Sequence, residues 1–238
     1  MKKKYKKLLF DLDNTLVDDD ENRRYAIKKI LEERKEKVNT NDIEDFLNID
    51  NKFWRDRAAG LIKDPYEFKS QQEKTDWVRA QRFIIFFKDI TLQEGIEINN
   101  KYIEYLNDNI IPMKNADKVL DTLYSKGYEL YIITNSPVKA INNKLTKSGF
   151  KKYITDVFSA EEAGHMKPHT EFYNNIYSKI GNDGDMLIVG DELGCDIALG
   201  INNNIDTCWF NNNSSENNTL YKPNFMIKDL IELTDIIE

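Results

Sequence analysis

The sequence is poor in the features that mark membrane, secreted and disulfide-bonded proteins. Its 238 residues include only two cysteines, Cys195 and Cys208, which have neither metal-site spacing nor disulfide density. No stretch approaches the ~20 apolar residues of a membrane span. The basic run Lys2–Lys7 is followed by only three apolar residues before Asp11, too few for a secretory signal. We therefore expect a cytoplasmic protein with no membrane partner, and we interpret the basic run as a solvated tail.

Positive charge and histidine are also scarce. The chain carries 34 lysines and arginines against 41 acidic residues, a formal net charge of -7, so it lacks the basic footprint of a nucleic-acid partner. Its two histidines, His165 and His169, do not make a zinc site without further nitrogen or sulfur ligands. A hydrophobic content of 40% with 32% charged residues is ordinary for one or two globular domains. Any bound anion must then be held locally, by a metal ion, a placed lysine or backbone amides.

Short apolar runs bounded by turn residues are typical of buried parallel strands. Such runs occur at Leu8–Phe10, Glu129–Ile133, Asp156–Phe158, Met186–Val189, Thr207–Phe210 and Phe225–Ile227. Helical patterns lie between several of them, at Asn115–Lys126 and Thr170–Ile180, and each is followed by a glycine that suits a helix end. This alternation predicts an α/β fold with a doubly wound, mostly parallel sheet.

The segment from about Asp19 to Ile111 has a different pattern, because it reads as helices throughout. The expected helices are Arg23–Arg34, a stretch around Asn41–Gly60, Pro65–Lys88 and Gly95–Asn109. We predict an α/β core domain formed by residues 1–17 and 112–238, with residues 18–111 inserted as a helical domain. No internal repeat is visible, and the asparagine-rich stretches 202–204 and 211–218 are expected to be loops.

Two carboxylates follow the first predicted strand directly, in the segment Asp11-Leu12-Asp13-Asn14-Thr15. Residues two apart in an extended segment project to the same side, so Asp11 and Asp13 are expected to lie together. Such a pair repels itself unless a cation or a substrate offsets the repulsion. An acidic turn without chemistry is the alternative, and the buried strand before the pair argues against it.

Two further polar clusters accompany the second and third strands. Thr134-Asn135-Ser136 follows Glu129–Ile133, where a hydroxyl and a backbone amide could bind a phosphoryl oxygen or simply cap a helix. Lys167-Pro168 precedes the Thr170–Ile180 helix, and proline there would hold the lysine in one direction. A lysine before a proline usually lies on the surface without a chemical role. The evidence for a role of Lys167 is its position between two predicted strands.

The fourth cluster, Gly190–Asp196, follows Met186–Val189 and contributes Asp191, Glu192 and Asp196. Carboxylates are hard oxygen ligands that suit Mg²⁺, although an acidic loop can also merely cap the next helix. Open α/β sheets bind their ligands at the carboxyl ends of the strands, where all four clusters are expected. Their coincidence is stronger evidence than any one of them.

Taken together, the four clusters resemble those of the haloacid dehalogenase superfamily, in that family's order and spacing. The helical insertion after the first cluster looks like that family's cap of the first type. Within the superfamily, the segments GDELGCDIALGINNNIDTCWFN and IPMKNADKVLDTLYSKGYELYIITN look similar to the pyrimidine 5′-nucleotidases that act on noncanonical nucleotides.

This resemblance implies a role for each matched residue. Asp11 would be the nucleophile, forming an aspartyl-phosphate, and Asp13 would be the general acid and base. Thr134, Asn135 and Lys167 would hold the phosphoryl oxygens. The metal ligands would be Asp11, the backbone carbonyl of Asp13, and Asp191.

Asp196 would stand behind these ligands and orient a bound water or Lys167. The implied cofactor is Mg²⁺, which would screen the anionic nucleophile from an anionic substrate.

The sequence departs from the family pattern at two positions. Glu192 stands where many relatives have serine or asparagine, and it could bind the metal or point away from it. His169 stands where an aspartate is common. Dehalogenases of the superfamily lack an acid at the position of Asp13, so its presence favours phosphoryl transfer.

The substrate expected from this resemblance is a small phosphomonoester, a nucleotide in the leading hypothesis. A sugar-phosphate phosphatase or phosphomutase is the alternative, and a catalytically idle binding domain is the alternative from another class. The inserted segment carries arginines and aromatics that could stack a nucleobase and meet its polar edge: Trp54, Arg55, Arg57, Trp77, Arg79, Arg82, Phe83, Phe86 and Phe87. For Trp77, Phe83, Phe86 and Phe87, which recur at helical spacing, the alternative is the segment's own core. We expect a monomer or a homodimer.

Overall fold

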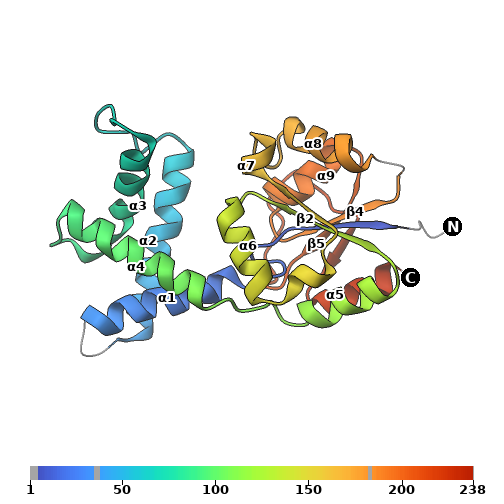
Figure 1. Ribbon diagram of the computed structural model, residues 1–238, viewed down its shortest axis with the longest axis horizontal. Helices are drawn as coiled ribbons and strands as arrows, with labels where there is room; N and C mark the ends of the chain where they lie inside the picture. Colours follow the sequence, from blue (N-terminus) through green and yellow to red (C-terminus); the bar gives the residue numbers. More distant parts are fainter. Residues whose placement is uncertain (1–4, 35–37, 182–183, 238) are drawn as a thin grey trace. The chain divides into compact units, whose positions relative to one another are not determined.

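The computed structural model describes residues 5–34, 38–181 and 184–237. Within them the chain separates into two compact units (Figure 1). The sheet unit contains the chain up to Asp19 and from Ile110 onward, and the helical unit is Asp20–Asn109. No helix in the described residues combines the length and apolar character that a membrane crossing needs.

The sheet unit is built on a six-stranded parallel sheet in the order β3-β2-β1-β4-β5-β6, counted over the described residues. The strands are β1 (Lys7–Phe10), β2 (Glu129–Thr134), β3 (Asp156–Ser159), β4 (Met186–Gly190), β5 (Asp206–Phe210) and β6 (Phe225–Ile227). Each coincides with a predicted apolar run to within a residue. The prediction of a doubly wound parallel sheet is therefore confirmed.

Helices cover both faces of this sheet (Figure 1). They are α5 (Ala116–Ser125), α6 (Val138–Lys147), α7 (Ala160–Ala163), α8 (Thr170–Ile180), α9 (Ala198–Asn202) and α10 (Leu233–Ile236). Single turns of other helix types lie at Phe150–Tyr153, Leu193–Ile197 and Leu230–Glu232.

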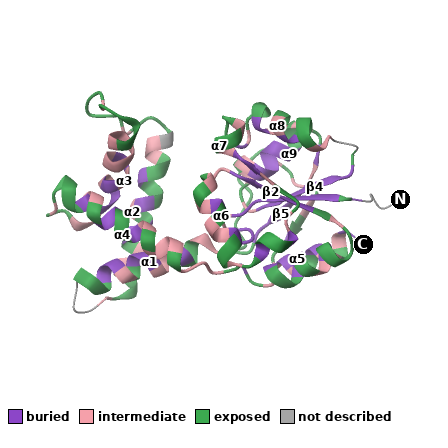
Figure 2. Cartoon of the chain, viewed as in Figure 1, coloured by how far each residue is buried: buried purple, intermediate pink, exposed green. Residues whose placement is uncertain are grey.

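Successive strand residues point to opposite faces, which divides the apolar residues between two cores. Leu8 and Phe10 of β1 pack with α5 and α6, whereas Leu9 packs with Phe172 and Ile176 of α8. Figure 2 shows the central strands buried along their length and the covering helices buried on one side only. This double burial explains why the strands read as continuous apolar runs rather than alternating ones.

The helical unit contains α1 (Asp19–Arg34), α2 (Thr40–Ala58), α3 (Gln71–Phe87) and α4 (Leu92–Asp108). Capping explains several of the boundaries: Asn39 and Thr91 each accept a hydrogen bond from the third helical residue, in reciprocal capping boxes. The close approach of α3 and α4 depends on Gly95, because a Cβ there would lie 3.2 Å from the Cβ of Ala80.

Several predictions were wrong in detail. The helices expected to begin at Arg23 and Gly95 begin at Asp19 and Leu92, and Asn202, expected in a loop, is the last residue of α9. The helix expected over Pro65–Lys88 begins only at Gln71, because the Ser70 hydroxyl caps it there. Lys7 is not part of a solvated tail: it is the buried first residue of β1, and its ammonium donates to the Ile180 carbonyl at 3.0 Å. Lys6 is exposed, and residues 2–4 of that basic run lie outside the described residues.

The aromatic residues of the insertion separate into core and surface. Phe83 is fully buried in the core of the helical unit, with Phe86 and Phe87 packed against it. Arg82 is buried as well, where its guanidinium donates to Asp50 at 2.8 Å and to Asn99 at 2.9 Å. For the three phenylalanines the interpretation as the unit's own core is confirmed, whereas the burial of Arg82 was not predicted.

Trp54, in contrast, is 40% exposed. Arg55 and Trp77 also retain exposed surface. Arg57 and Arg79 are partly exposed as well, so these five residues of the set keep a surface on which a ligand could lie.

Candidate active site

The four polar clusters meet at the carboxyl edge of the sheet. β1, β2 and β4 are parallel neighbours, so the loops after Phe10, Thr134 and Gly190 leave the sheet side by side. They line a cavity of about 320 Å³. Its lining residues are Asp11, Asp13, Asn14, Thr134, Asn135, Ser136, Pro137, Lys167, Asp191, Glu192, Cys195 and Asp196.

The Asp-x-Asp segment places one residue in the core and two in the cavity. Leu12 is fully buried in the apolar core, while Asp11 and Asp13 on either side of it line the cavity. The Asp11 amide donates to the Val189 carbonyl at 2.9 Å and so extends the pairing with β4 by one residue. Asn14, with a φ of 59°, then turns the chain away.

Lys167 is the cation at the centre of the site, and it is only 5% exposed. Its ammonium donates to Asp11 Oδ1 and Asp196 Oδ1, each at 2.6 Å, and to the Ile133 carbonyl at 2.8 Å. Burial alone lowers the pKa of Lys167, but the charges of Asp11 and Asp196 outweigh burial and hold this pKa above its ordinary value. The lysine is therefore a permanent positive charge beneath the cavity.

Asn135 holds the backbone of Lys167 in place. Its side-chain oxygen accepts from the Lys167 amide at 2.8 Å, and its side-chain nitrogen donates to the Lys167 carbonyl at 3.4 Å. Thr134 is buried, and its hydroxyl oxygen accepts from the Ser136 amide at 3.0 Å. The loop after β2 thus positions the lysine and contributes polar groups to the cavity wall.

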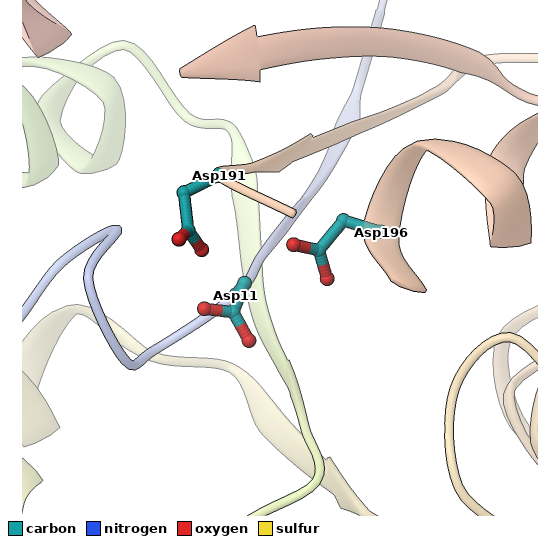
Figure 3. A group of neighbouring side chains, drawn as sticks. All are labelled: Asp11, Asp191 and Asp196. Carbon is teal, nitrogen blue, oxygen red and sulfur yellow. The ribbon is translucent and has the colours of Figure 1, made fainter. Parts of the chain in front are cut away.

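Three carboxylates converge beside this lysine (Figure 3). Asp11, Asp191 and Asp196 each offer one oxygen, and these oxygens all lie within 4.8 Å of one another. Asp191 is held by the Thr15 hydroxyl, which donates to its Oδ1 at 3.3 Å, and by Trp209 Nε1, which donates to its backbone carbonyl at 2.8 Å. All-oxygen donors of this kind fit a hard divalent cation such as Mg²⁺.

The pKa shifts reflect an excess of negative charge in the cluster. Burial raises the pKa of Asp11 well above its ordinary value; Lys167 opposes this, and Asp196 and Asp191 add to it. Burial raises the pKa of Asp191 to about 7, with further contributions from Asp196 and Glu192. One ammonium does not balance this set of carboxylates, so the residues present favour a bound cation.

Asp196 is almost completely buried and uses both of its oxygens. Oδ1 accepts from Lys167, and Oδ2 accepts from the Glu192 amide at 3.1 Å. Gly190 makes room for it, because a Cβ at that position would lie 2.3 Å from the Asp196 carboxyl. The glycine of the Gly-Asp segment is therefore a packing requirement of the site.

Several residues near the cavity lack an evident chemical role. Glu192 is exposed, and the acidic group that converges in Figure 3 does not include it. Burial, with Glu192 nearby, raises the pKa of the Cys195 thiol, which keeps it protonated at neutral pH. His165 and His169 are exposed and do not line the cavity.

Lys144 was not predicted as part of the site, and Ser136 was predicted only as a member of the second cluster, without its contact to Asp13. Lys144 lies on α6, a helix that was not predicted, and its ammonium bonds to the carboxylate of Asp13 and to Asp19 at 2.7 Å. Ser136 donates its hydroxyl to the other oxygen of Asp13. The apolar spacing of Val138, Ile141 and Leu145 was the available signal for the helix.

Comparisons with known proteins show the family of the chain. Residues 8–210 match the family model described as haloacid dehalogenase-like hydrolase. The pyrimidine 5′-nucleotidase PynA of Streptococcus pneumoniae is 29% identical over 98% of this chain and 95% of its own. A glyceraldehyde 3-phosphate phosphatase of Methanocaldococcus jannaschii is 30% identical over 81% of this chain and 78% of its own.

A solved structure is also similar over the whole chain. The crystal structure of the HAD-hydrolase YfnB of Bacillus subtilis, bound to magnesium, superposes with a TM-score of 0.84. It is 26% identical and covers 99% of this chain and 100% of its own. The chain belongs to the haloacid dehalogenase-like hydrolases, and the resemblance inferred from the four clusters is confirmed.

Proposed function

We propose that this protein is a Mg²⁺-dependent phosphomonoester hydrolase, a 5′-nucleotidase acting on pyrimidine nucleoside monophosphates. The observation that carries the proposal is the buried Lys167 held between Asp11 and Asp196, with Asp191 beside them and the cavity above. A phosphoryl group in transfer needs positive charge close to its oxygens. A buried lysine and a set of carboxylates that can bind a cation supply this charge together.

The Asp11 carboxylate would attack phosphorus as the bond from phosphorus to the ester oxygen breaks, leaving an aspartyl-phosphate. Asp13, on the same side of the chain, would give a proton to the departing oxygen. In the second step Asp13 would take a proton from a water molecule, whose oxygen attacks phosphorus and releases phosphate from Asp11. Such acid–base help is typically worth about 10²–10⁴-fold in rate.

Binding of the phosphoryl group would fall to the residues that surround the nucleophile. Lys167 would stabilise the negative charge of the transferring group, and Thr134 and Asn135 would line the space that this group occupies. Mg²⁺ held by Asp11, Asp191 and the Asp13 carbonyl would neutralise the repulsion between nucleophile and substrate. Asp196 would keep Lys167 oriented through the contact it already makes.

We further propose that the helical unit is a cap that excludes water and selects the leaving group. The pyrimidine nucleotide is supported by the likeness to PynA over nearly the whole chain, and the exposed Trp54 could stack a base. A sugar-phosphate phosphatase is the second candidate, because the M. jannaschii glyceraldehyde 3-phosphate phosphatase is 30% identical.

The test is phosphate release from nucleoside 5′-monophosphates of both base types, glyceraldehyde 3-phosphate and hexose phosphates, with Mg²⁺ and then with EDTA. We expect metal-dependent release that is fastest for pyrimidine nucleotides and is lost in Asp11→Asn. The matched control is Asp121→Asn, which removes the same charge at an exposed position of α5.

Each other outcome has a distinct meaning. Metal-dependent release from sugar phosphates alone would keep the mechanism and replace the nucleotidase by the second candidate. Isomerisation without net phosphate release would indicate a mutase. Full activity in Asp11→Asn, or in EDTA, would overturn the proposed mechanism.

A further inference from the structure

The environment of Asp13 differs from that of Asp11, because both of its carboxylate oxygens are held from the side. The Ser136 hydroxyl donates to Oδ2, and the Lys144 ammonium donates to Oδ1. These contacts come from two elements, the loop after β2 and the helix α6. Asp13 is half-buried and lines the cavity, so the two contacts fix the direction in which its carboxylate faces.

Lys144 is itself firmly placed. Its side chain is 14% exposed, and Ile141 and Leu145 on the same helix are buried in the apolar core. The ammonium also donates to Asp19 Oδ1 at 2.7 Å. A lysine between two carboxylates keeps its charge, and its stem has little freedom to move.

We propose that Lys144 is a positioning residue that holds the Asp13 carboxylate in the geometry needed for proton transfer to the leaving oxygen. This inference rests on the proposed function, which makes Asp13 the general acid and base. A general acid acts only within hydrogen-bond reach of the oxygen that it protonates. A misplacement of about 1 Å can cost on the order of 10²-fold in rate.

Asp19 helps to hold Lys144 in place. It begins α1, at the point where the chain leaves the sheet unit, and the Asp18 amide beside it donates to the Ile111 carbonyl at 2.9 Å. The second carboxylate thus anchors the lysine to a paired stretch of backbone. We expect Asp19→Ala to have the same kind of effect as loss of Lys144, but a smaller one.

The test exploits the leaving group. A nucleoside is a poor leaving group that needs the proton from Asp13, whereas 4-nitrophenolate leaves readily without one. We expect Lys144→Met to lower kcat/KM for the best nucleotide by about 10- to 100-fold. For 4-nitrophenyl phosphate we expect a loss below about threefold, since the protonation step contributes little there. Asp13→Asn should show the same pattern with a larger loss.

Two further variants separate positioning from folding. Lys144→Arg should restore most of the nucleotide activity, because a guanidinium can still donate to the carboxylate of Asp13. Lys147→Met removes the same charge from an exposed position of the same helix. It should leave kcat/KM for both substrates unchanged. Thermal unfolding of each variant measures its folding separately from its rate.

Equal losses for both substrates in Lys144→Met, with the arginine variant no better, would overturn the positioning role and leave the proposed function intact. Unchanged nucleotide activity in Lys144→Met would also overturn the positioning role and leave the proposed function intact. Absence of metal-dependent turnover in the unmodified protein would overturn the proposed function and this inference with it.

Discussion

At the scale of single residues, the site depends on side chains that constrain one another. Lys167 is held by Asp11 and Asp196 on one side and by Asn135 along its backbone. Asp196 in turn fits only because Gly190 has no side chain. Moving any one of them therefore disturbs the charge balance around Asp11.

Gly190→Ala tests this dependence. The added methyl would lie 2.3 Å from the Asp196 carboxyl, which forces Asp196 and with it Lys167 to shift. We expect a loss of about 1–3 kcal/mol in the free energy of unfolding, as for other overpacked sites, and a loss of most phosphatase activity. Urea unfolding and phosphate release measure the two effects.

Gly194→Ala is the matched control, because a Cβ there meets no atom within 4 Å. It lies in the turn Leu193–Ile197, shortly after the end of β4, and makes the same chemical change. If the two variants behaved alike, the close packing of Asp196 against Gly190 would not be what the site requires.

At the scale of elements, a buried network of charged and polar side chains joins α1, α2, α3 and α4. Arg82 on α3 donates to Asp50 on α2 at 2.8 Å and to Asn99 on α4 at 2.9 Å. Arg23 on α1 donates to the second oxygen of Asp50 at 2.6 Å. Buried ion pairs and hydrogen bonds therefore hold the helices of this unit together, in addition to their apolar core.

Arg82→Met should destabilise the helical unit by about 3 kcal/mol, since removal of one partner leaves buried polar groups unmatched. This value is at the lower end of the usual range because Asp50 keeps its contact with Arg23. Urea unfolding followed by circular dichroism measures the change. Lys101→Met, which breaks an exposed ion pair with Glu33, should cost far less, because water screens that pair. An equal cost for the two variants would contradict this prediction.

The elements were also the most predictable part of the structure. The six apolar runs became the six described strands, and Thr170–Ile180 was predicted with its observed bounds. Helix α6 escaped prediction because it has few apolar residues, and polar Asn142, Asn143 and Lys144 separate Ile141 from Leu145. The early start expected for α3 was wrong because a single capping hydroxyl, at Ser70, decides where that helix begins.

At the scale of the whole molecule, buried acids that fold in their neutral form limit stability at alkaline pH. Burial, and then the hydrogen bond to Asp206, raise the pKa of the Tyr5 phenol above its ordinary value. Burial raises the pKa of the Cys208 thiol to about 12, from an ordinary value of 9.0. Both groups lie in or beside the sheet, Tyr5 before β1 and Cys208 on β5.

The direction of this pH dependence follows from the linkage between protonation and folding. Above its ordinary pKa each group loses its proton in the unfolded chain but keeps it in the folded one, so rising pH favours unfolding. For Cys208 we expect the free energy of unfolding to fall between pH 9 and about 12 by up to about 1.4 kcal/mol per pH unit. Urea unfolding across this range measures the slope.

Cys208→Ala and Tyr5→Phe should each make the alkaline loss of stability shallower, whatever they do to stability at neutral pH. Each removes one group that the folded state holds protonated. A slope identical to that of the unmodified protein in both variants would show that these groups do not set the alkaline limit.

The sequence by itself determined the sheet and the family, and it singled out Asp11, Asp13, Lys167, Asp191 and Asp196 as candidate site residues. Apolar runs between turn residues can be buried in few other ways, and the polar clusters follow the strands directly in the chain. Tertiary structure alone decided the contacts among them: the burial of Lys167 between Asp11 and Asp196, and the placement of Lys144 against Asp13. Those contacts join residues more than 100 positions apart or on different elements, and their geometry depends on how helices pack against the sheet, which local sequence patterns do not encode.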